Sequence, residues 1–155
     1  MEIRMAKPED IPGLIDLLLQ VGEVHHKIRP DLFRAGARKY DEKALTEILK
    51  DPNRPIFAAV EDGTLLGYCF CILEVTRDNP VLMDQKSLYI DDLCVDENAR
   101  GKHVGARLYD FAMDYARKIG CDSLTLNVWC GNDSAMKFYE SRGLKQRNIH
   151  MEARL

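Results

Sequence analysis

The sequence predicts one α/β domain in which a mixed central sheet carries helices on both faces. Segments with strand and helix patterns follow one another in the order βααβββαβαβ, which is typical of layered α/β domains. The tight turn Asp62-Gly63 joins two strands in antiparallel pairing, whereas a later strand, helix and strand form a parallel crossover. With 155 residues and 46% hydrophobic content, residues 1–155 are enough for a single domain with its own core.

The first part of the chain contains a short strand and two amphipathic helices. Residues 3–6 are the predicted strand, and Asp10 is the predicted N-cap of the first helix. Apolar residues at helical spacing give this helix one buried face, formed by Ile11, Leu14, Ile15, Leu18 and Val21. Asp41 is expected to cap the second helix, which buries Ala44, Leu45, Ile48 and Leu49.

The middle of the chain supplies the centre of the sheet. Residues 56–60 are predicted as a strand, and residues 65–75 return from the tight turn as a strand that is apolar on both faces. Because both of its faces are apolar, this second strand is expected inside the sheet. Residues 88–95 form a further strand, which contains the adjacent carboxylates Asp91 and Asp92.

The last part of the chain alternates helices and strands. A helix over residues 101–118 carries an apolar stripe and ends at Gly120, and a strand over residues 123–130 follows. The next helix is expected from Asp133 to Ser141. Residues 149–155 are expected to form a closing strand.

Composition and charge argue against several classes of function. The chain has 22 basic and 25 acidic residues, and its net charge of −3 is spread without the basic stripe of a nucleic-acid-binding protein. No apolar run approaches the ~18–20 residues of a membrane span, and the N-terminal residues lack the apolar core of a signal peptide. We therefore expect a cytoplasmic protein with no nucleic-acid or membrane partner. Five scattered cysteines are expected to be reduced and to pack mainly as small apolar side chains, namely Cys69, Cys71, Cys94, Cys121 and Cys130.

The stretch from Leu93 to Ala106 is the most informative part of the sequence. A strand leads into a basic turn, and the turn opens an amphipathic helix whose first N–H groups carry partial positive charge. Arg100 and Lys102 add full charges, while Gly101 and Gly105 allow close approach of a ligand to the backbone. This pattern favours a phosphate or pyrophosphate site, and it fits a charged loop with turn glycines equally well. It is neither a Walker A loop nor a G-x-G-x-x-G motif.

A second informative stretch runs from Asn132 to Gly143. Phe138 and Tyr139 share a helix face with Ala135, a pattern typical of aromatic packing, although the Tyr139 hydroxyl can also donate a proton. Together the two stretches resemble the GNAT superfamily of N-acetyltransferases. In that family a strand leads into [RQ]-x-x-G-x-[GA] at a helix start, and N-x-x-A-x-x-F-Y-x-x-x-G follows. Here the first motif falls on Arg100 to Gly105, with one departure, and the second on Asn132 to Gly143, and the resemblance covers nearly the whole chain.

The resemblance implies that acetyl-CoA is the co-substrate. Its pyrophosphate is expected on the amides of the turn, at Arg100, Gly101, Lys102, His103, Val104, Gly105 and Ala106. Its pantetheine arm is expected along the backbone of the preceding strand, at Leu93, Cys94 and Val95, where the family strand is splayed at a bulge. Asn132 corresponds to a family position that reaches toward the cofactor. His103 stands where the family usually has glycine, so its side chain must point away from the pyrophosphate or contact it.

The resemblance also implies an acid and a base. Tyr139 corresponds to the usual acid near the departing sulfur. An amine with a lysine-like pKa lies about 3.4 units from its free base at pH 7, which is roughly 4.6 kcal/mol, so a base matters at least as much as the acid. Asp91 and Asp92 are the candidate bases, and the resemblance favours Asp91.

Strand alternation assigns these two carboxylates to opposite faces of the sheet. Asp91 is expected on the face of Leu93 and Val95, and Asp92 on the opposite face with Ile90 and Cys94, unless a bulge intervenes. Because Cys94 then points away from the face of the strand that carries Leu93 and Val95, no cysteine nucleophile is expected.

The acceptor wall is expected after the first helix. His25 and Phe33 there, together with Asp92, are the candidate substrate-binding residues, although a solvated histidine pair His25-His26 fits the sequence too. No third ligand lies near the two histidines, so no metal is predicted. Trp129 shares a strand face with Asn127 and either lines the pocket or packs in the core or in an interface.

These observations predict an N-acetyltransferase that uses acetyl-CoA. The acceptor is expected to be a primary amine, in a small molecule or a peptide, that attacks directly in a ternary complex. The alternative is a non-catalytic acyl-CoA-binding sensor or assembly module. The resemblance is compatible with a homodimer, and the sequence leaves the identity of the amine open.

Overall fold

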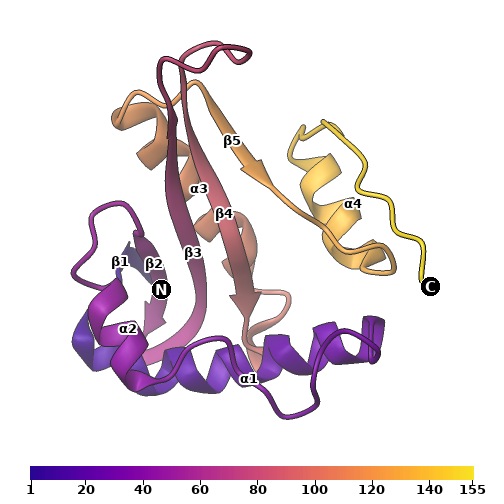
Figure 1. Cartoon of the computed structure of the whole chain (residues 1–155). Coiled ribbons are helices and arrows are strands. Elements are labelled where there is room, and N and C mark those ends of the chain that lie inside the picture. Colours follow the sequence, from indigo (N-terminus) through magenta and orange to yellow (C-terminus); the bar gives the residue numbers. More distant parts are fainter.

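The computed structural model describes residues 1–155 as a five-stranded sheet covered by helices (Figure 1). The predicted α/β class with a mixed sheet and helices on both faces is confirmed. The elements in chain order are β1 (Glu2–Met5), η1 (Pro8–Asp10), α1 (Ile11–Ile28), α2 (Glu42–Ile48), β2 (Ile56–Glu61), β3 (Thr64–Thr76), β4 (Gln85–Val95), η2 (Glu97–Ala99), α3 (Val104–Lys118), β5 (Ser123–Leu126) and α4 (Asp133–Ser141), where η marks a 3-10 helix.

The strands lie in the sheet in chain order, from β1 to β5. Neighbours from β1 to β4 are antiparallel, and β4 and β5 are parallel because α3 connects them across one face. The turn between β2 and β3 has positive φ at Asp62 (51°) and Gly63 (76°), which is the geometry of a two-residue hairpin. As expected from its apolar faces, β3 lies inside the sheet.

Two apolar cores, one on each face, hold the layers together. Alternate residues of β3 enter opposite cores, so that Cys69 packs with Leu108 of α3 while Tyr68 packs with Leu18 of α1. The α3 core is built chiefly from Phe57, Cys69, Cys71, Leu88, Ile90, Val104, Leu108 and Ala112. The α1 and α2 core is built chiefly from Leu14, Leu17, Leu18, Leu45, Ile48, Ile56, Tyr68 and Phe70.

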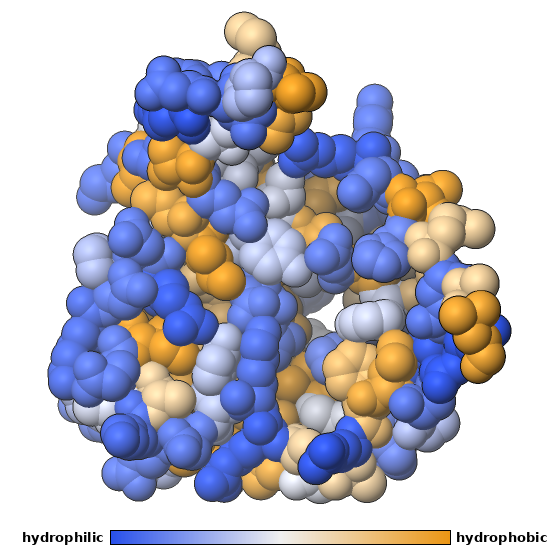
Figure 2. Space-filling view, in the orientation of Figure 1, coloured by the Kyte–Doolittle hydropathy of each residue, from blue (hydrophilic) through white to orange (hydrophobic).

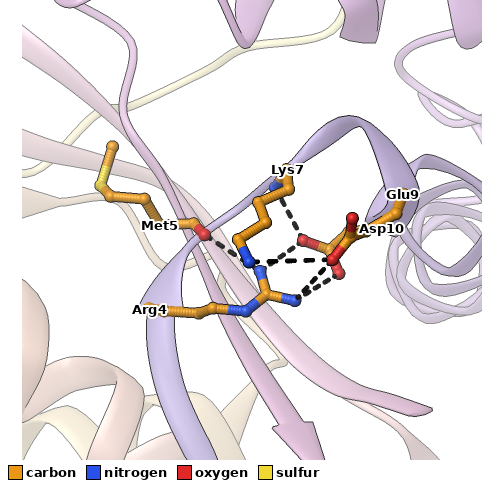
Figure 3. Close-up of polar contacts among 5 residues, drawn as sticks. All are labelled: Arg4, Met5, Lys7, Glu9 and Asp10. Carbon is orange, nitrogen blue, oxygen red and sulfur yellow. Dashed lines mark hydrogen bonds and ion pairs between the residues drawn. The ribbon is translucent and has the colours of Figure 1, made fainter. Parts of the chain in front are cut away.

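A buried ion pair ties β1 to the start of α1 (Figure 3). The Arg4 guanidinium donates to both carboxylate oxygens of Asp10, at 2.7 and 3.0 Å, and the Lys7 amide donates to the same carboxylate at 2.7 Å. Asp10 is only 7% exposed. Burial alone would raise the pKa of Asp10, but the Arg4 and Lys7 hydrogen bonds outweigh it and hold that pKa below its usual value.

Two expectations for the last part of the chain are wrong. The strand predicted over residues 123–130 ends at Leu126, because the backbone then turns into the α4 N-cap, where the Asn132 amide donates to the Trp129 carbonyl at 3.0 Å. The closing strand predicted over residues 149–155 is absent, since no strand of the sheet pairs with this segment.

The long helix of the second half begins later than predicted. Residues 101–103 form the turn before it, with positive φ at Gly101 (81°) and His103 (58°), and α3 starts at Val104. None of the helices has both the length and the apolar content that crossing a membrane requires.

Candidate active site

The separation of β4 from β5 creates the central feature of the site. The two strands pair only from Ser87 to Ile90 on β4 and from Ser123 to Leu126 on β5. Beyond Ile90, β4 continues to Val95 with β3 on one side and no strand on the other. Figure 1 shows β5 diverging from β4 toward α4, and Figure 2 shows an opening through the molecule at this place. The β4 backbone from Asp91 to Val95 therefore has one open edge inside the molecule.

A β-bulge lies where the two strands part. Phe70 of β3 pairs with Asp92 and its neighbour Cys71 pairs with Ile90, so Asp91 is the extra residue on β4. The insertion shifts the alternation of side chains along the strand, and residues on either side of it no longer follow one period. The splayed, bulged strand that the family resemblance implies is thus present.

The bulge corrects the predicted faces of β4. Ile90 packs in the α3 core with Leu93 and Val95, not with Asp92. Asp91 was expected on the face of Leu93 and Val95, but its carboxylate contacts residues of the segment between α1 and α2, on the opposite face. The assignment of Asp92 and Cys94 to one face is confirmed, since Asp92 bonds Tyr68 and Cys94 packs with Tyr68 in the α1 and α2 core.

Asp91 and Asp92 therefore lie on the same face and have different partners. Lys39 Nζ donates to Asp91 Oδ2 at 2.6 Å, and the Tyr40 hydroxyl lies 3.4 Å from the same oxygen. The Tyr68 hydroxyl donates to Asp92 Oδ2 at 2.7 Å. Burial raises the pKa of Asp92, against the hydrogen bond from Tyr68 and the positive charge of Lys39.

The turn between β4 and α3 is the site predicted for a pyrophosphate. Asp96 caps η2 by accepting from the Asn98 amide at 2.7 Å, and the chain then reaches the N-terminus of α3 through residues 100–103. His103 is the N-cap residue and holds a left-handed conformation, which explains why glycine is usual here, and its side chain makes no capping bond. The first N–H groups of α3 have no partner within the helix.

The two basic residues of the turn differ in their surroundings. Arg100 is exposed and makes no ion pair within the chain, whereas Lys102 Nζ pairs with Glu61 at 3.2 Å. A β-carbon added at Gly105 would lie 3.5 Å from Val95 and 3.8 Å from Leu93, which is ordinary contact. The amide end of α3 thus lies directly beside the open edge of β4.

The α4 motif lies on the other side of the opening. Asn132 is the N-cap of α4, and its side chain accepts from the Ala135 amide at 3.2 Å. Tyr139 packs against Phe138 and Tyr109, with ring centroids 5.1 and 6.3 Å away, but its hydroxyl makes no hydrogen bond in the chain. No fully buried side-chain oxygen lacks a partner, so this hydroxyl keeps access to solvent. Burial of the ring raises the pKa of Tyr139, which keeps the hydroxyl protonated at neutral pH.

An aromatic group links the end of α1 to the loop after β5. Phe33 packs on His25 at 5.0 Å between centroids and meets the edge of Trp129 at 5.1 Å. Asn127 turns instead toward β4, where its Nδ2 donates to the Tyr89 hydroxyl at 3.1 Å. The structure thus brings the predicted acceptor residues His25 and Phe33 together with Trp129.

Comparison with known families agrees with this geometry. Residues 22–144 match the model of the acetyltransferase (GNAT) family. The chain belongs to the GNAT family. Over 149 residues it is 32% identical to an uncharacterized N-acetyltransferase, YhfO, of Bacillus subtilis strain 168. The aligned region covers 94% of this chain and 91% of YhfO.

Two further proteins are similar along most of the chain. It is 24% identical over 149 residues to thialysine N-epsilon-acetyltransferase of Bos taurus, covering 91% of this chain and 82% of that protein. The crystal structure of a mutant BH1408 protein from Bacillus halodurans has a TM-score of 0.95 at 29% identity, covering 100% of this chain and 99% of that one. The GNAT fold expected from the two motifs is therefore confirmed.

Sequence reasoning missed Lys39, Tyr40 and Tyr68, which surround the two carboxylates. Lys39 is 52 positions from Asp91, and Tyr68 is 24 positions from Asp92. No local motif contains these pairs, so no spacing along the chain could reveal them. Nowhere in the chain do three or more His, Cys, Asp or Glu side chains converge as a metal site.

Proposed function

We propose that this GNAT protein transfers the acetyl group of acetyl-CoA to a primary amine by direct attack in a ternary complex. The observation that carries the proposal is the open edge of β4 between Asp91 and Val95, which leads into the free N–H groups of α3. A co-substrate with an amide-rich arm and a pyrophosphate needs these two features in this order, because an unpaired strand edge pairs with amides and a helix N-terminus binds phosphate.

The residues of β4 and the turn fit acetyl-CoA in chemistry. Leu93, Cys94 and Val95 supply backbone N–H and C=O groups for the pantetheine arm, and one of their amides polarises the thioester carbonyl. The turn from Arg100 to Ala106 supplies amides and two cations for the pyrophosphate, of which Arg100 has no other charged partner. The side-chain oxygen of Asn132 accepts a hydrogen bond at the helix cap, which leaves its side-chain nitrogen to donate to the co-substrate.

The catalytic roles fall on Asp91 and Tyr139. Asp91 takes a proton from the acceptor's ammonium, and the free amine then attacks the thioester carbonyl, forming the C–N bond as the C–S bond breaks. The nitrogen loses its second proton to solvent as the amide forms, while Tyr139 gives its proton to the departing sulfur and regains one from solvent. The Tyr139 hydroxyl carries its proton at neutral pH, as a phenol ordinarily does, so it has a proton to give to the sulfur.

Lys39 indicates the class of amine that the site accepts. Its ammonium lies 2.6 Å from Asp91 Oδ2 and 5.5 Å from the centroid of the Tyr40 ring, so a carboxylate and an aromatic face together form a site for an alkylammonium ion. The Lys39 side chain is 48% exposed and lies between α1 and α2, outside any helix or strand. An acceptor ammonium can therefore replace it, and we infer a cationic alkylamine acceptor that also contacts His25 and Phe33. The Bos taurus relative is named for the ε-amine of thialysine, an acceptor of this class.

Calorimetry with acetyl-CoA tests the cofactor site. Arg100→Ala combined with Gly105→Asp should abolish binding, since it removes a free cation and adds a negative charge at the amide end of α3. Arg117→Ala is the matched control, because it removes an exposed arginine paired with Asp114 elsewhere on α3. Retained binding in the double variant would contradict the assigned site.

Release of CoA thiol with a panel of polyamines, amino acids, aminoglycosides and peptides tests the reaction. Turnover with a cationic alkylamine is the expected result. Saturable binding of acetyl-CoA without turnover on any amine would favour a non-catalytic acyl-CoA-binding module instead.

A further inference from the structure

Lys39 occupies the position beside Asp91 that the proposed function gives to the acceptor amine. Its Nζ donates to Asp91 Oδ2 at 2.6 Å, and no other Lys, Arg or His side chain forms an ion pair with Asp91 or Asp92. The other paired lysines contact carboxylates outside β4, as Lys50 does with Glu47 at 2.8 Å. One primary amine of the chain thus lies in direct contact with the proposed base.

The backbone is held in place on both sides of Lys39. Before it, a β-carbon added at Gly22 of α1 would lie 2.4 Å from the Ala37 carbonyl oxygen, so glycine is needed for this close approach to α1. After it, the Tyr40 hydroxyl accepts from the Arg54 guanidinium at 2.7 Å. The pairing of Lys39 with Asp91 is therefore a consequence of how the segment between α1 and α2 packs.

The ion pair lies at the start of the open edge of β4. The pairing of β4 with β5 ends at Ile90, so Asp91 is the first residue of this edge. Leu93, which we assign to the co-substrate, lies roughly 7 Å farther along the strand, at about 3.3 Å per residue. The Lys39 side chain is 48% exposed, and its flexible stem of four methylenes lets the amine turn from Asp91 to the edge.

The charge of Lys39 explains why its acetylation would need Asp91. Burial alone would lower the pKa of Lys39, but the hydrogen bond and the negative charge of Asp91 outweigh it and raise that pKa. Lys39 is accordingly an ammonium ion at neutral pH, and its nitrogen cannot attack a carbonyl until a base removes a proton. Lys50 has no such partner on β4, so any uncatalysed acetylation of Lys50 does not depend on Asp91.

We propose that Lys39 is a self-acetylation site, to which the protein transfers one acetyl group from acetyl-CoA when no acceptor is bound. The inference rests on the proposed function, because it uses the same co-substrate, base and acid. Asp91 takes a proton from the Lys39 ammonium, and the amine attacks the thioester carbonyl, forming the C–N bond as the C–S bond breaks. The nitrogen loses its second proton to solvent, while Tyr139 protonates the departing sulfur and regains a proton from solvent. The product amide is uncharged and not nucleophilic, so the reaction stops at one acetyl group on Lys39.

Mass spectrometry of the full-length chain, incubated with acetyl-CoA and no added amine, tests this site. The peptide that contains Lys39 should carry one acetyl group, and Lys50→Arg, the matched control, should be acetylated at Lys39 at the wild-type rate. Asp91→Asn should slow acetylation of Lys39 by at least about 100-fold and leave any labelling of Lys50 unchanged. Tyr139→Phe should slow it by about 10- to 100-fold, and it provides an independent test if Asp91→Asn does not fold.

The outcomes separate self-acetylation from uncatalysed labelling and from transfer between copies. An unmodified Lys39 in the wild type would overturn the inference, as would equal acetylation in the wild type, Asp91→Asn and Tyr139→Phe. The rate constant should be independent of protein concentration, and a rate constant that rises with concentration would contradict transfer within one chain. Turnover of an added amine with Lys39 unmodified would refute self-acetylation alone, whereas the absence of both would refute the proposed function as well.

Discussion

Replacing Lys39 by methionine tests the ammonium site at Asp91 directly. In the free protein Lys39 Nζ lies 2.6 Å from Asp91 Oδ2, and the Lys39 side chain is 48% exposed while Asp91 is 14% exposed. An amine that binds Asp91 must break this ion pair. Pairs with an exposed partner contribute roughly 0.2–1 kcal/mol. Removing the competing ammonium should therefore lower the KM for a cationic alkylamine by about 1.4- to 5-fold.

The assay measures CoA thiol release at saturating acetyl-CoA, so that kcat and KM for the amine are obtained separately. The kcat of Lys39→Met should stay unchanged, because the bound amine has already displaced Lys39 from Asp91 when the acetyl group is transferred. Lys39→Arg keeps a cation beside Asp91 and should keep the KM close to that of the wild type. Lys50→Met is a second control, because it removes an exposed lysine that pairs with Glu47 and not with Asp91 or Asp92.

An increase in KM for Lys39→Met would refute the reasoning, since it would mean that Lys39 helps to bind the acceptor. An unchanged KM would also refute it, because the acceptor would then not compete for Asp91. The free energy of unfolding, measured by heating, should change by no more than about 1 kcal/mol, as expected for an ion pair whose lysine is half exposed.

Four further predictions concern the reaction and the fold. Tyr139→Phe should lower kcat by about 10- to 100-fold with little change in the KM for acetyl-CoA, and an unchanged kcat would remove Tyr139 from the mechanism. Asp91→Asn should lower kcat by roughly 10²- to 10⁴-fold while acetyl-CoA binding persists in calorimetry. Arg4→Met should destabilise the protein by about 3–5 kcal/mol in urea unfolding, because Asp10 is left buried without its cation. The pKa of Asp10 is lowered in the folded protein, so the difference in the free energy of unfolding between the wild type and Arg4→Met should be complete above pH ~4. It should shrink as the pH falls through the pKa of Asp10 in the folded protein, and a difference that does not change with pH would contradict the ion pair. His103→Gly should raise stability by about 0–1.5 kcal/mol, because glycine relieves the left-handed conformation at a smaller entropic cost; a loss of stability would contradict this account.

The local elements of the fold could be predicted from the sequence because their determinants lie close together in the chain. The apolar spacing of α1 and the cap at Asp41 predicted the two helices of the first half, and both are confirmed. The tight turn at Asp62-Gly63 predicted the β2 and β3 hairpin in the same way. The glycine-containing turn after β4 and the motif from Asn132 to Tyr139 indicated the GNAT family, since each motif lies within one turn or one helix.

The closing strand shows where such local reasoning fails. A strand pattern states which side chains can share a face, but a strand also needs a partner with free backbone groups. Ion pairs to Arg29 and Asp31 hold residues 149–155 at the end of α1, and no strand of the sheet pairs with them. Only the tertiary arrangement could reveal that.

The sequence by itself predicted most of the helices and strands, the family, and the two segments to which we assign the co-substrate, because each depends on residues a few positions apart. Only the tertiary structure showed which residues surround Asp91. One extra residue at Asp91 moved its carboxylate to the other face of β4, where Lys39 lies from 52 positions away. A bulge depends on the register between two strands, and an ion pair between distant segments depends on how the whole chain packs. Neither can therefore be predicted from a local sequence pattern.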